Sequence, residues 1–190
     1  MFNTQLFHKL KRGPQVVVLK DAAIVSAFTG LQSGDRVIDC GAGSGFLAIY
    51  LGSLVAPSGR VYSYERREEF AALAAKNVEK ASLASVVEVK TKDAANGFEE
   101  KEADLVTLDC GDSPLLLEHA FAALKKEGYC IGFLPNVEQV KAFAEKASEV
   151  GFKLLATHRL VDEEWLIRPQ GCRPENTGLM HTSFLCFLRK

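Results

Sequence analysis

Two kinds of segment alternate along most of this 190-residue chain, and this alternation constrains the fold more than any other feature. Short runs rich in β-branched residues are separated by Ala- and Leu-rich segments of helical length. Such alternation builds βαβ units, in which parallel strands form one sheet that helices cover. The expected strands are 36–40, 60–64, 86–90, 104–108 and 129–134, and the expected helices are 44–55, 67–82, 114–126 and 136–149.

The two ends of the chain complete the predicted sheet. A helix at about 20–30 precedes the first strand, and Gly128 is predicted to close the helix at 114–126 as a C-cap. Strand-like runs at 152–160 and 179–188 are joined by a helix-free loop at 168–178, which implies an antiparallel pair at one sheet edge. We therefore predict a single α/β domain, residues 1–190, with a Rossmann-like seven-stranded, mostly parallel sheet, helices on both faces and an antiparallel C-terminal strand.

Composition excludes several classes of protein. A hydrophobic fraction of 47% supports a real core and argues against wholesale disorder. No apolar run approaches the roughly 18–20 residues of a membrane helix, and the N-terminus lacks the pattern of a secretory signal, so no membrane role is expected. Five scattered cysteines without a CxxC motif or zinc-ligand spacing predict reduced thiols, no metal and a cytoplasmic location.

The net charge of −1 conceals an uneven distribution. Residues 1–20 carry four basic residues and no acidic one, and residues 151–190 carry six basic and four acidic residues. The middle, 21–150, has 13 basic and 20 acidic residues. The chain is thus an acidic body between basic ends, and its near-neutral total does not exclude a nucleic-acid partner.

A glycine-rich loop joins the first strand to the next helix. Alternating glycines let the backbone turn sharply and let a ligand lie against the peptide groups. Unlike a dinucleotide loop, this one has an acid two residues before its first glycine, which repels phosphate and suits a cationic ligand. S-adenosylmethionine carries an ammonium and a sulfonium and no phosphate, so we predict it as the cofactor; a tight turn with incidental glycines is the alternative. The predicted loop contacts are Asp39, Gly41, Ala42, Gly43, Ser44, Gly45 and Phe46.

Acidic residues follow the next two strands. Glu65 ends the second strand, where a carboxylate can accept both ribose hydroxyls. Asp93 follows the third strand and can accept from the adenine amino group, with Ala94 beside it. We predict that these residues and Arg66 complete the cofactor site. A surface glutamate beside Arg66, and a turn or cap role for Asp93, are the alternatives.

The strand–helix order, the loop motif and the terminal antiparallel strands together resemble the class I S-adenosylmethionine-dependent methyltransferases over essentially the whole chain. In that family the cofactor lies across the C-terminal ends of the first strands. Its seventh strand runs antiparallel, inserted beside the fifth.

Three further segments resemble the tRNA (adenine-N1) methyltransferases that act at position 57/58 of the T-loop. They are Arg12-Gly13-Pro14-Gln15 followed by Lys20-Asp21-Ala22, the segment 134–140 (LPNVEQV), and Arg173-Pro174 followed by 181–185 (HTSFL). The resemblance implies methylation of adenine N1 in tRNA. Gln15 is added to the predicted cofactor contacts, and the predicted substrate contacts are Arg12, Lys20, Pro135, Asn136, Arg168, Arg173 and His181.

Asp109, at the end of the fourth strand, is the predicted catalytic residue and also a cofactor contact. Adenine N1 is a neutral nitrogen with a lone pair, so its methylation needs no strong base. It needs an extruded base that is aligned with the sulfonium. A carboxylate that accepts from the exocyclic amine orients the base and stabilises the charge developing on the ring. A polar cap on a buried strand is the alternative.

The basic ends predict a substrate surface. In the expected topology the N-terminal arm, residues 1–20, and the loop near 166–178 approach the cofactor's edge of the sheet, so Arg12, Lys20, Arg168 and Arg173 are predicted to form an RNA-facing rim. Ordinary solvated charge is the alternative for the arginines and Lys20, and a structural histidine is the alternative for His181.

Departures from the family keep other functions open. Its members usually carry an N-terminal β-rich domain that helps to hold tRNA, whereas this sequence begins almost at the RGPQ segment; we expect a catalytic domain without that module. Aromatic residues that line the base pocket in many relatives are replaced, with Val18 and Phe133 at two such positions. The alternatives are a small-molecule methyltransferase like those of corrinoid biosynthesis and a non-catalytic subunit. The family also implies a homo-oligomer (dimer or tetramer), or pairing with a separate RNA-binding subunit.

Overall fold

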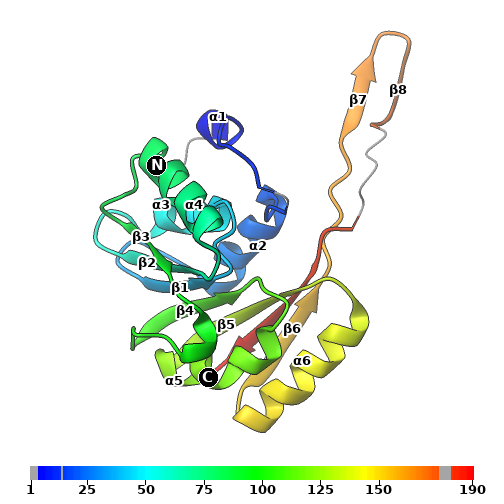
Figure 1. Ribbon diagram of the computed structural model, residues 1–190. Helices are drawn as coiled ribbons and strands as arrows, with labels where there is room; N and C mark the ends of the chain where they lie inside the picture. Colours follow the sequence, from blue (N-terminus) through cyan, green and yellow to red (C-terminus); the bar gives the residue numbers. More distant parts are fainter. Residues whose placement is uncertain (1–3, 14, 176–180) are drawn as a thin grey trace.

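A seven-stranded sheet forms the centre of the molecule in the computed structural model, which describes residues 4–13, 15–175 and 181–190 (Figure 1). The strand order is β3-β2-β1-β4-β5-β9-β6. Strands β1 to β5 are parallel neighbours, and β9 runs antiparallel between β5 and β6. The strands are β1 (Arg36–Cys40), β2 (Arg60–Glu65), β3 (Val87–Thr91), β4 (Ala103–Leu108), β5 (Leu124–Leu134), β6 (Lys153–His158) and β9 (Phe184–Arg189). The predicted fold class and the inserted antiparallel strand are confirmed.

Helices cover both faces of this sheet. The helical segments are α1 (Thr4–Phe7), α2 (Leu19–Thr29), α3 (Phe46–Val55), α4 (Glu68–Lys80), η1 (Ala94–Asn96), η2 (Ser113–Leu116), α5 (Leu117–Ala123) and α6 (Val137–Val150). Neighbouring residues of a strand enter opposite cores: Val37 packs with α2 and α3, whereas Ile38 packs with α5 and α6. Burial on both faces explains why the central strands are almost continuously apolar.

The predicted C-cap at Gly128 is wrong. Helix α5 ends at Ala123, and β5 begins at Leu124, which pairs with Ala103 of β4 and is 1% exposed. The pairing then resumes between Leu105 and Tyr129, so the intervening residues bulge out of the ladder. Burying Leu124 beside β4 therefore overrides the local pattern of a helix closed by glycine.

The predicted loop at 168–178 is also wrong in part. Strands β7 (Trp165–Arg168) and β8 (Gly171–Pro174) form a separate two-stranded antiparallel ribbon. This ribbon projects from the body of the molecule (Figure 1). The predicted strand at 179–188 appears as β9 from Phe184, and residues 179 and 180 lie outside the described residues.

No helix within the described parts of the chain is long and apolar enough to cross a membrane.

Candidate cofactor and active site

The glycine loop lies directly against the end of β4. It leaves β1 at Cys40, and α3 begins at Phe46. Gly41 has a φ of +94°, and a Cβ there would run into the carbonyl of Asp109. Gly45 has a φ of +81°, and a Cβ there would lie 3.2 Å from Ala74 of α4. These positions therefore require glycine, because side chains are disfavoured by both the backbone angle and the space.

Glu65 fastens this loop from the neighbouring strand. Its carboxylate is 5% exposed, and Oε2 accepts a hydrogen bond from the Gly43 amide at 3.0 Å. Oε1 accepts from the amide and the Nε of Arg67, at 3.1 and 3.2 Å. The carboxylate is therefore held at the end of β2, beside the loop, with its position fixed by three donors.

The N-terminal arm is joined to the same loop by Asn77, a fully buried residue of α4 that the sequence analysis missed. Its amide nitrogen donates to the carbonyls of Lys11 (2.9 Å) and Ser44 (2.8 Å), and its oxygen accepts from the Lys11 amide. The Gly13 amide also donates to Ser44 Oγ at 3.2 Å. These bonds place the arm beside the loop, where exposed Gln15 reaches the cleft.

The structure corrects the predicted contact of Asp39 with a cationic ligand. This carboxylate is 1% exposed and accepts from Ser63 Oγ (2.6 Å) and Thr107 Oγ1 (2.8 Å), so it points between strands rather than into the cleft. Burial raises its pKa, and the two hydroxyl bonds oppose that shift. Asp39 braces β1, β2 and β4 beneath the glycine loop.

Asp109 follows β4 immediately and faces the cleft. Its amide donates to the carbonyl of Cys40 at 2.8 Å, which extends the contact between β1 and β4 by one residue. Although the side chain is open to the cleft, protein surrounds it on its other sides. This desolvation raises the pKa of Asp109 to about 7, with smaller contributions from the charges of Asp39 and Asp21.

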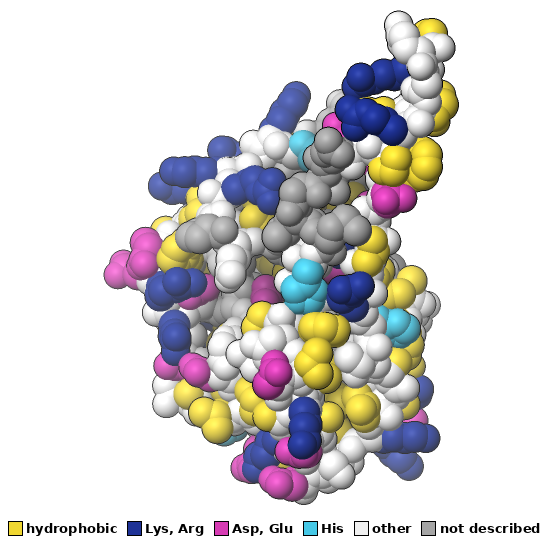
Figure 2. Space-filling model, turned by 90° about the vertical axis from the view of Figure 1, so that its right-hand side faces the viewer, with side chains coloured by type: hydrophobic (Ala, Val, Ile, Leu, Met, Phe, Trp, Pro, Cys, Tyr) yellow, Lys and Arg dark blue, Asp and Glu magenta, His cyan; other side chains and the backbone are white. Residues whose placement is uncertain are grey.

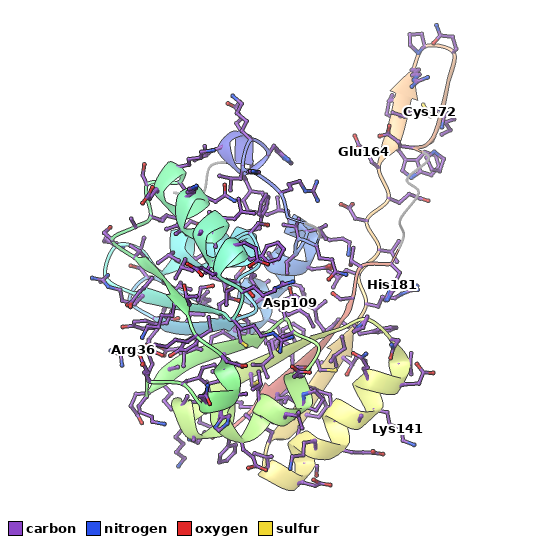
Figure 3. The ribbon with its side chains drawn as sticks, in the orientation of Figure 1. Arg36, Asp109, Lys141, Glu164, Cys172 and His181 are labelled. Carbon is purple, nitrogen blue, oxygen red and sulfur yellow. The ribbon has the colours of Figure 1, made fainter. Side chains whose placement is uncertain are left out.

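A cleft of about 340 Å³ lies over these elements, along the carboxyl edge of the first four strands. Figure 3 shows Asp109 near the middle of that edge. Of the predicted cofactor contacts, those that line the cleft are Gln15, Gly41, Gly43, Ser44, Glu65, Arg66, Asp93, Ala94 and Asp109. The remaining ones, which lie outside the lining, are Asp39, Ala42, Gly45 and Phe46. Lining residues that were not among the predicted cofactor contacts are Gly13, Cys40, Tyr64, Arg67, Phe70, Lys92, Ala95, Cys110, Gly111, Asp112, Leu115 and Leu116.

Asp93 and Asp112 line the cleft in different ways. Asp93 caps η1, since its Oδ1 accepts from the Ala95 amide at 2.9 Å. The side chain of Asp112 makes no cap bond to η2; it forms an ion pair with Arg66 at 3.1 Å. Asp93 therefore has the capping role that the sequence offered as the alternative to cofactor binding, and it also lines the cleft.

The charges of the cleft indicate which ligand it fits. Within the described residues, each basic side chain that lines it is paired with a carboxylate: Arg66 with Asp112, Arg67 with Glu65, and Lys92 with Glu99. The cleft thus offers carboxylates rather than a free cation. This pattern fits a nucleoside ligand with a positive group better than a phosphorylated one.

Comparison with known proteins identifies the family. Residues 4–183 match the family described as "tRNA methyltransferase complex GCD14 subunit". The chain belongs to this family. It is 30% identical to the tRNA (adenine(57)-N(1)/adenine(58)-N(1))-methyltransferase TrmI of Methanocaldococcus jannaschii, in a match that covers 97% of this chain and 74% of that relative.

Solved structures share the fold of this chain. A SAM-dependent O-methyltransferase from Thermotoga maritima is similar with a TM-score of 0.87 and 31% identity, over 97% of this chain and 71% of that one. The tRNA (m1A58) methyltransferase TrmI from Aquifex aeolicus is similar with a TM-score of 0.86 and 23% identity, over 98% and 74%.

The three segments that resemble this family are bonded to one another. Lys20 Nζ donates to Asp21 (2.7 Å) and to Thr182 Oγ1 (2.8 Å), and Thr182 donates to the second oxygen of Asp21 at 2.6 Å. His181 Nε2 donates to the carbonyl of Pro135 at 2.8 Å. The segments near Lys20, Pro135 and His181, far apart in sequence, thus meet at the start of β9.

The residues of the predicted rim lie on different elements, outside the lining of the cleft. Lys20, Pro135 and His181 are used in the contacts just described, and the side-chain oxygen of Asn136 caps α6 by accepting from the Gln139 amide at 2.9 Å. None of the predicted substrate residues lines the cleft. Exposed Arg168 and Arg173 lie on the projecting ribbon, because β7 and β8 pair with each other instead of folding onto the sheet. Arg12 is exposed on the N-terminal arm.

Proposed function

We propose that this chain transfers a methyl group from S-adenosylmethionine to N1 of adenine in the T-loop of tRNA, at position 58 or 57. The observation that carries the proposal is the position of Asp109: its backbone is packed on Gly41 of the glycine loop, and its carboxylate faces the cleft. A carboxylate is thereby presented beside the expected cofactor site. Membership in the GCD14 family supports the choice of substrate.

The cofactor would be held by groups that already have fixed positions. Glu65 accepts from the ribose hydroxyls, and Asp93 accepts from the adenine amine, with Ala94 and Phe70 packing beside the nucleoside. Gly41, Gly43 and Ser44 present backbone to the remainder of the cofactor, and Gln15 closes the side next to the arm. The bound cofactor supplies an electrophilic methyl group.

Asp109 would position the target base. Its ionised carboxylate accepts a hydrogen bond from the exocyclic amine, which holds N1 in line with the methyl group. Methylation moves the positive charge from sulfur to the adenine ring, and the carboxylate stabilises that charge where it develops. No proton has to leave N1, so the role of Asp109 is orientation and electrostatic stabilisation.

The ribbon and the N-terminal arm would hold the RNA outside the cleft. We assign Arg12, Arg168 and Arg173 to phosphate contacts, which account for most of the affinity of such complexes. Lys20, Pro135, Asn136 and His181 would shape the entrance for the extruded base through the contacts that join their segments.

We infer that the chain works as a homo-oligomer through its ribbon. Trp165 is 53% exposed and Ile167 is 75% exposed, and a two-stranded ribbon is at best marginally stable in water without cover. The side chains of the projecting ribbon include both hydrophobic and basic ones (Figure 2). Light scattering should find a dimer or tetramer, and Trp165→Ala with Ile167→Ala should lower the mass. A monomer at all concentrations would refute self-association and favour a separate RNA-binding subunit.

The five free thiols agree with a cytoplasmic location.

Labelled S-adenosylmethionine and unmodified tRNA test the proposed activity. We expect 1-methyladenosine at the T-loop with the unaltered chain and almost none with Asp109→Ala. Cofactor binding without methylation of tRNA would favour the small-molecule alternative. Absence of cofactor binding would favour a non-catalytic subunit.

A further inference from the structure

Two thiols lie together in the wall of the cleft. Cys40 is the last residue of β1, Cys110 follows Asp109, and their sulfur atoms are 3.9 Å apart. Both residues line the cleft. The other cysteines are not comparable, because Cys130 and Cys186 are fully buried in the sheet and Cys172 is exposed on the ribbon.

The two sulfurs differ in how freely they can move. Cys40 is 4% exposed and is held in the sheet between Tyr64 and Leu108. Cys110 lies in the turn after β4 and is followed by Gly111, whose Cα has open space where a side chain would project. A disulfide needs the sulfurs about 2 Å apart, so they have to come roughly 2 Å closer, by movement of the turn together with rotation of the Cys110 side chain.

We propose that Cys40 and Cys110 form an oxidisable dithiol, and that a disulfide between them blocks the cleft. The second part rests on the proposed function, since it concerns the cofactor assigned to this cleft. Within the described parts of the chain, the two sulfurs do not belong to any group of three or more His, Cys, Asp or Glu side chains that could hold a metal ion. The pair is therefore better suited to thiol chemistry than to metal binding.

The oxidant is a low-molecular-weight disulfide. The Cys110 thiolate attacks one sulfur of that disulfide, forms a mixed disulfide and releases one thiolate. The Cys40 thiol then loses its proton and attacks the Cys110 sulfur, which releases the second thiolate. The protein loses two electrons and two thiol protons, and the small disulfide becomes two thiols.

Cys110 is the first thiol to react. It lines the open cleft and is partly exposed, whereas Cys40 is buried behind it. The hydrogen bond between the thiols lowers the pKa of Cys110 and raises that of Cys40. Reactivity requires the thiolate, so access and ionisation favour the same sulfur.

The disulfide would act on the site through the residues beside Cys110. Asp109 precedes it, and Asp112 holds Arg66 in the ion pair at the cleft. Pulling the turn toward β1 displaces both carboxylates and narrows the space above Gly41. Bound cofactor covers the same turn, so it should protect the thiols in return.

Oxidised glutathione and peptide mapping test the dithiol in a Cys172→Ser background, which removes the exposed thiol of the ribbon. We expect a peptide cross-linked between Cys40 and Cys110, slower formation with S-adenosylhomocysteine present, and reversal by dithiothreitol. The matched variant Cys110→Ser should give no internal cross-link. A glutathione adduct that stays on Cys110, or no reaction at either thiol, would overturn the proposal.

Calorimetric titration with S-adenosylhomocysteine tests the effect on the cleft. The oxidised protein should bind at least tenfold more weakly than the reduced protein, and dithiothreitol should restore the affinity. Equal affinity of the cross-linked and reduced forms would overturn the blocking role. If the reduced protein itself fails to bind, the proposed function is refuted, and the mapping still decides whether the dithiol exists.

Discussion

The cofactor cleft and the β7–β8 ribbon are built in opposite ways. In the cleft, the parts are bonded to one another within the chain: Glu65 holds Gly43, and Asn77 joins the N-terminal arm to Ser44. On the ribbon, the two strands pair with each other as a separate sheet, and Trp165 and Ile167 remain exposed. The described parts of the cleft are thus joined within one chain, whereas the ribbon is the surface that the proposed self-association would cover.

Under the proposed function, this difference assigns the chemistry to the cleft and the recognition of RNA to the ribbon. The cleft is lined by carboxylates and paired cations, which suits a cationic nucleoside. The ribbon carries Arg168 and Arg173 beside apolar side chains, which suits phosphates and a protein surface. Substitutions in the cleft should therefore act on the isolated chain, and substitutions on the ribbon should act only when RNA or a second copy is present.

The largest effect is expected from Asp109→Asn. The amide keeps the shape of the side chain but removes the charge that stabilises the methylated ring, which should lower kcat by about 10²–10³-fold. Cofactor affinity should change far less. Single-turnover methylation of tRNA measures the first effect and calorimetry the second. A kcat within threefold of the unaltered chain would assign Asp109 the role of a strand cap.

A pair of glycine substitutions tests the packing of the glycine loop. Gly41→Ala combines a positive φ with a collision against the Asp109 carbonyl, which should lower the free energy of unfolding by about 2–5 kcal/mol. At Gly111, two residues beyond Asp109, a Cβ would project into open space, so Gly111→Ala should change the free energy of unfolding by less than about 0.5 kcal/mol. Urea unfolding measures both, and equal effects would refute the close approach of the loop and β4.

Most of the fold can be predicted from patterns that are local in the sequence. The elements that were predicted wrongly depend on contacts between residues that are distant in the sequence. Apolar β-branched runs are enough to predict β1 to β4 and the second part of β5. Gly128 misleads because burial of Leu124 beside Ala103 decides where β5 begins. The ribbon was missed because strands of four residues carry too little pattern to distinguish them from a loop.

The site was predictable to a similar degree. The glycine motif and the acids after successive strands identify most of one side of the cleft, because parallel strands end at the same edge. Asp39 differs, since two hydroxyls on neighbouring strands capture its carboxylate. Asn77 was missed because its partners Lys11 and Ser44 are 66 and 33 residues away, and a lone asparagine in an Ala-rich helix carries no signal.

Glu65→Gln should weaken the cofactor without unfolding the chain. Hydrogen bonds to a charged acceptor are worth about 1.5–3 kcal/mol, so the loss of charge should lower affinity for S-adenosylhomocysteine by roughly 10- to 100-fold. Glu69→Gln makes the same charge change at an exposed site on α4 and should leave the affinity unchanged. Calorimetry compares the two. Equal affinities would indicate that Glu65 only supports the loop.

The pH dependence of methylation should reveal the state of Asp109. Its raised pKa of about 7 means that the carboxyl is mostly protonated below pH 7 and becomes a charged acceptor above it. At pH 6 about a tenth of it is ionised, so kcat/KM for the cofactor should rise roughly tenfold from pH 6 to pH 8. The Asp109→Asn variant should lack this step. A step of the same size in the variant would assign the titration to another group.

The smallest effect is expected on the ribbon. Arg168→Ala combined with Arg173→Ala should weaken tRNA binding by about fivefold and lower the slope of log K against log salt by about 2, since each arginine is assigned one phosphate. Lys141→Ala with Lys153→Ala removes the same charge from exposed sites on α6 and β6 and should have no such effect.

Binding of S-adenosylhomocysteine should be the same in both double variants, because neither pair lines the cleft. If the ribbon variant instead lost cofactor affinity, the ribbon would have to be coupled to the cleft, and the separation of the two regions would fail. If both variants weakened tRNA equally, the effect would come from overall charge, and the ribbon would have no particular role in holding RNA.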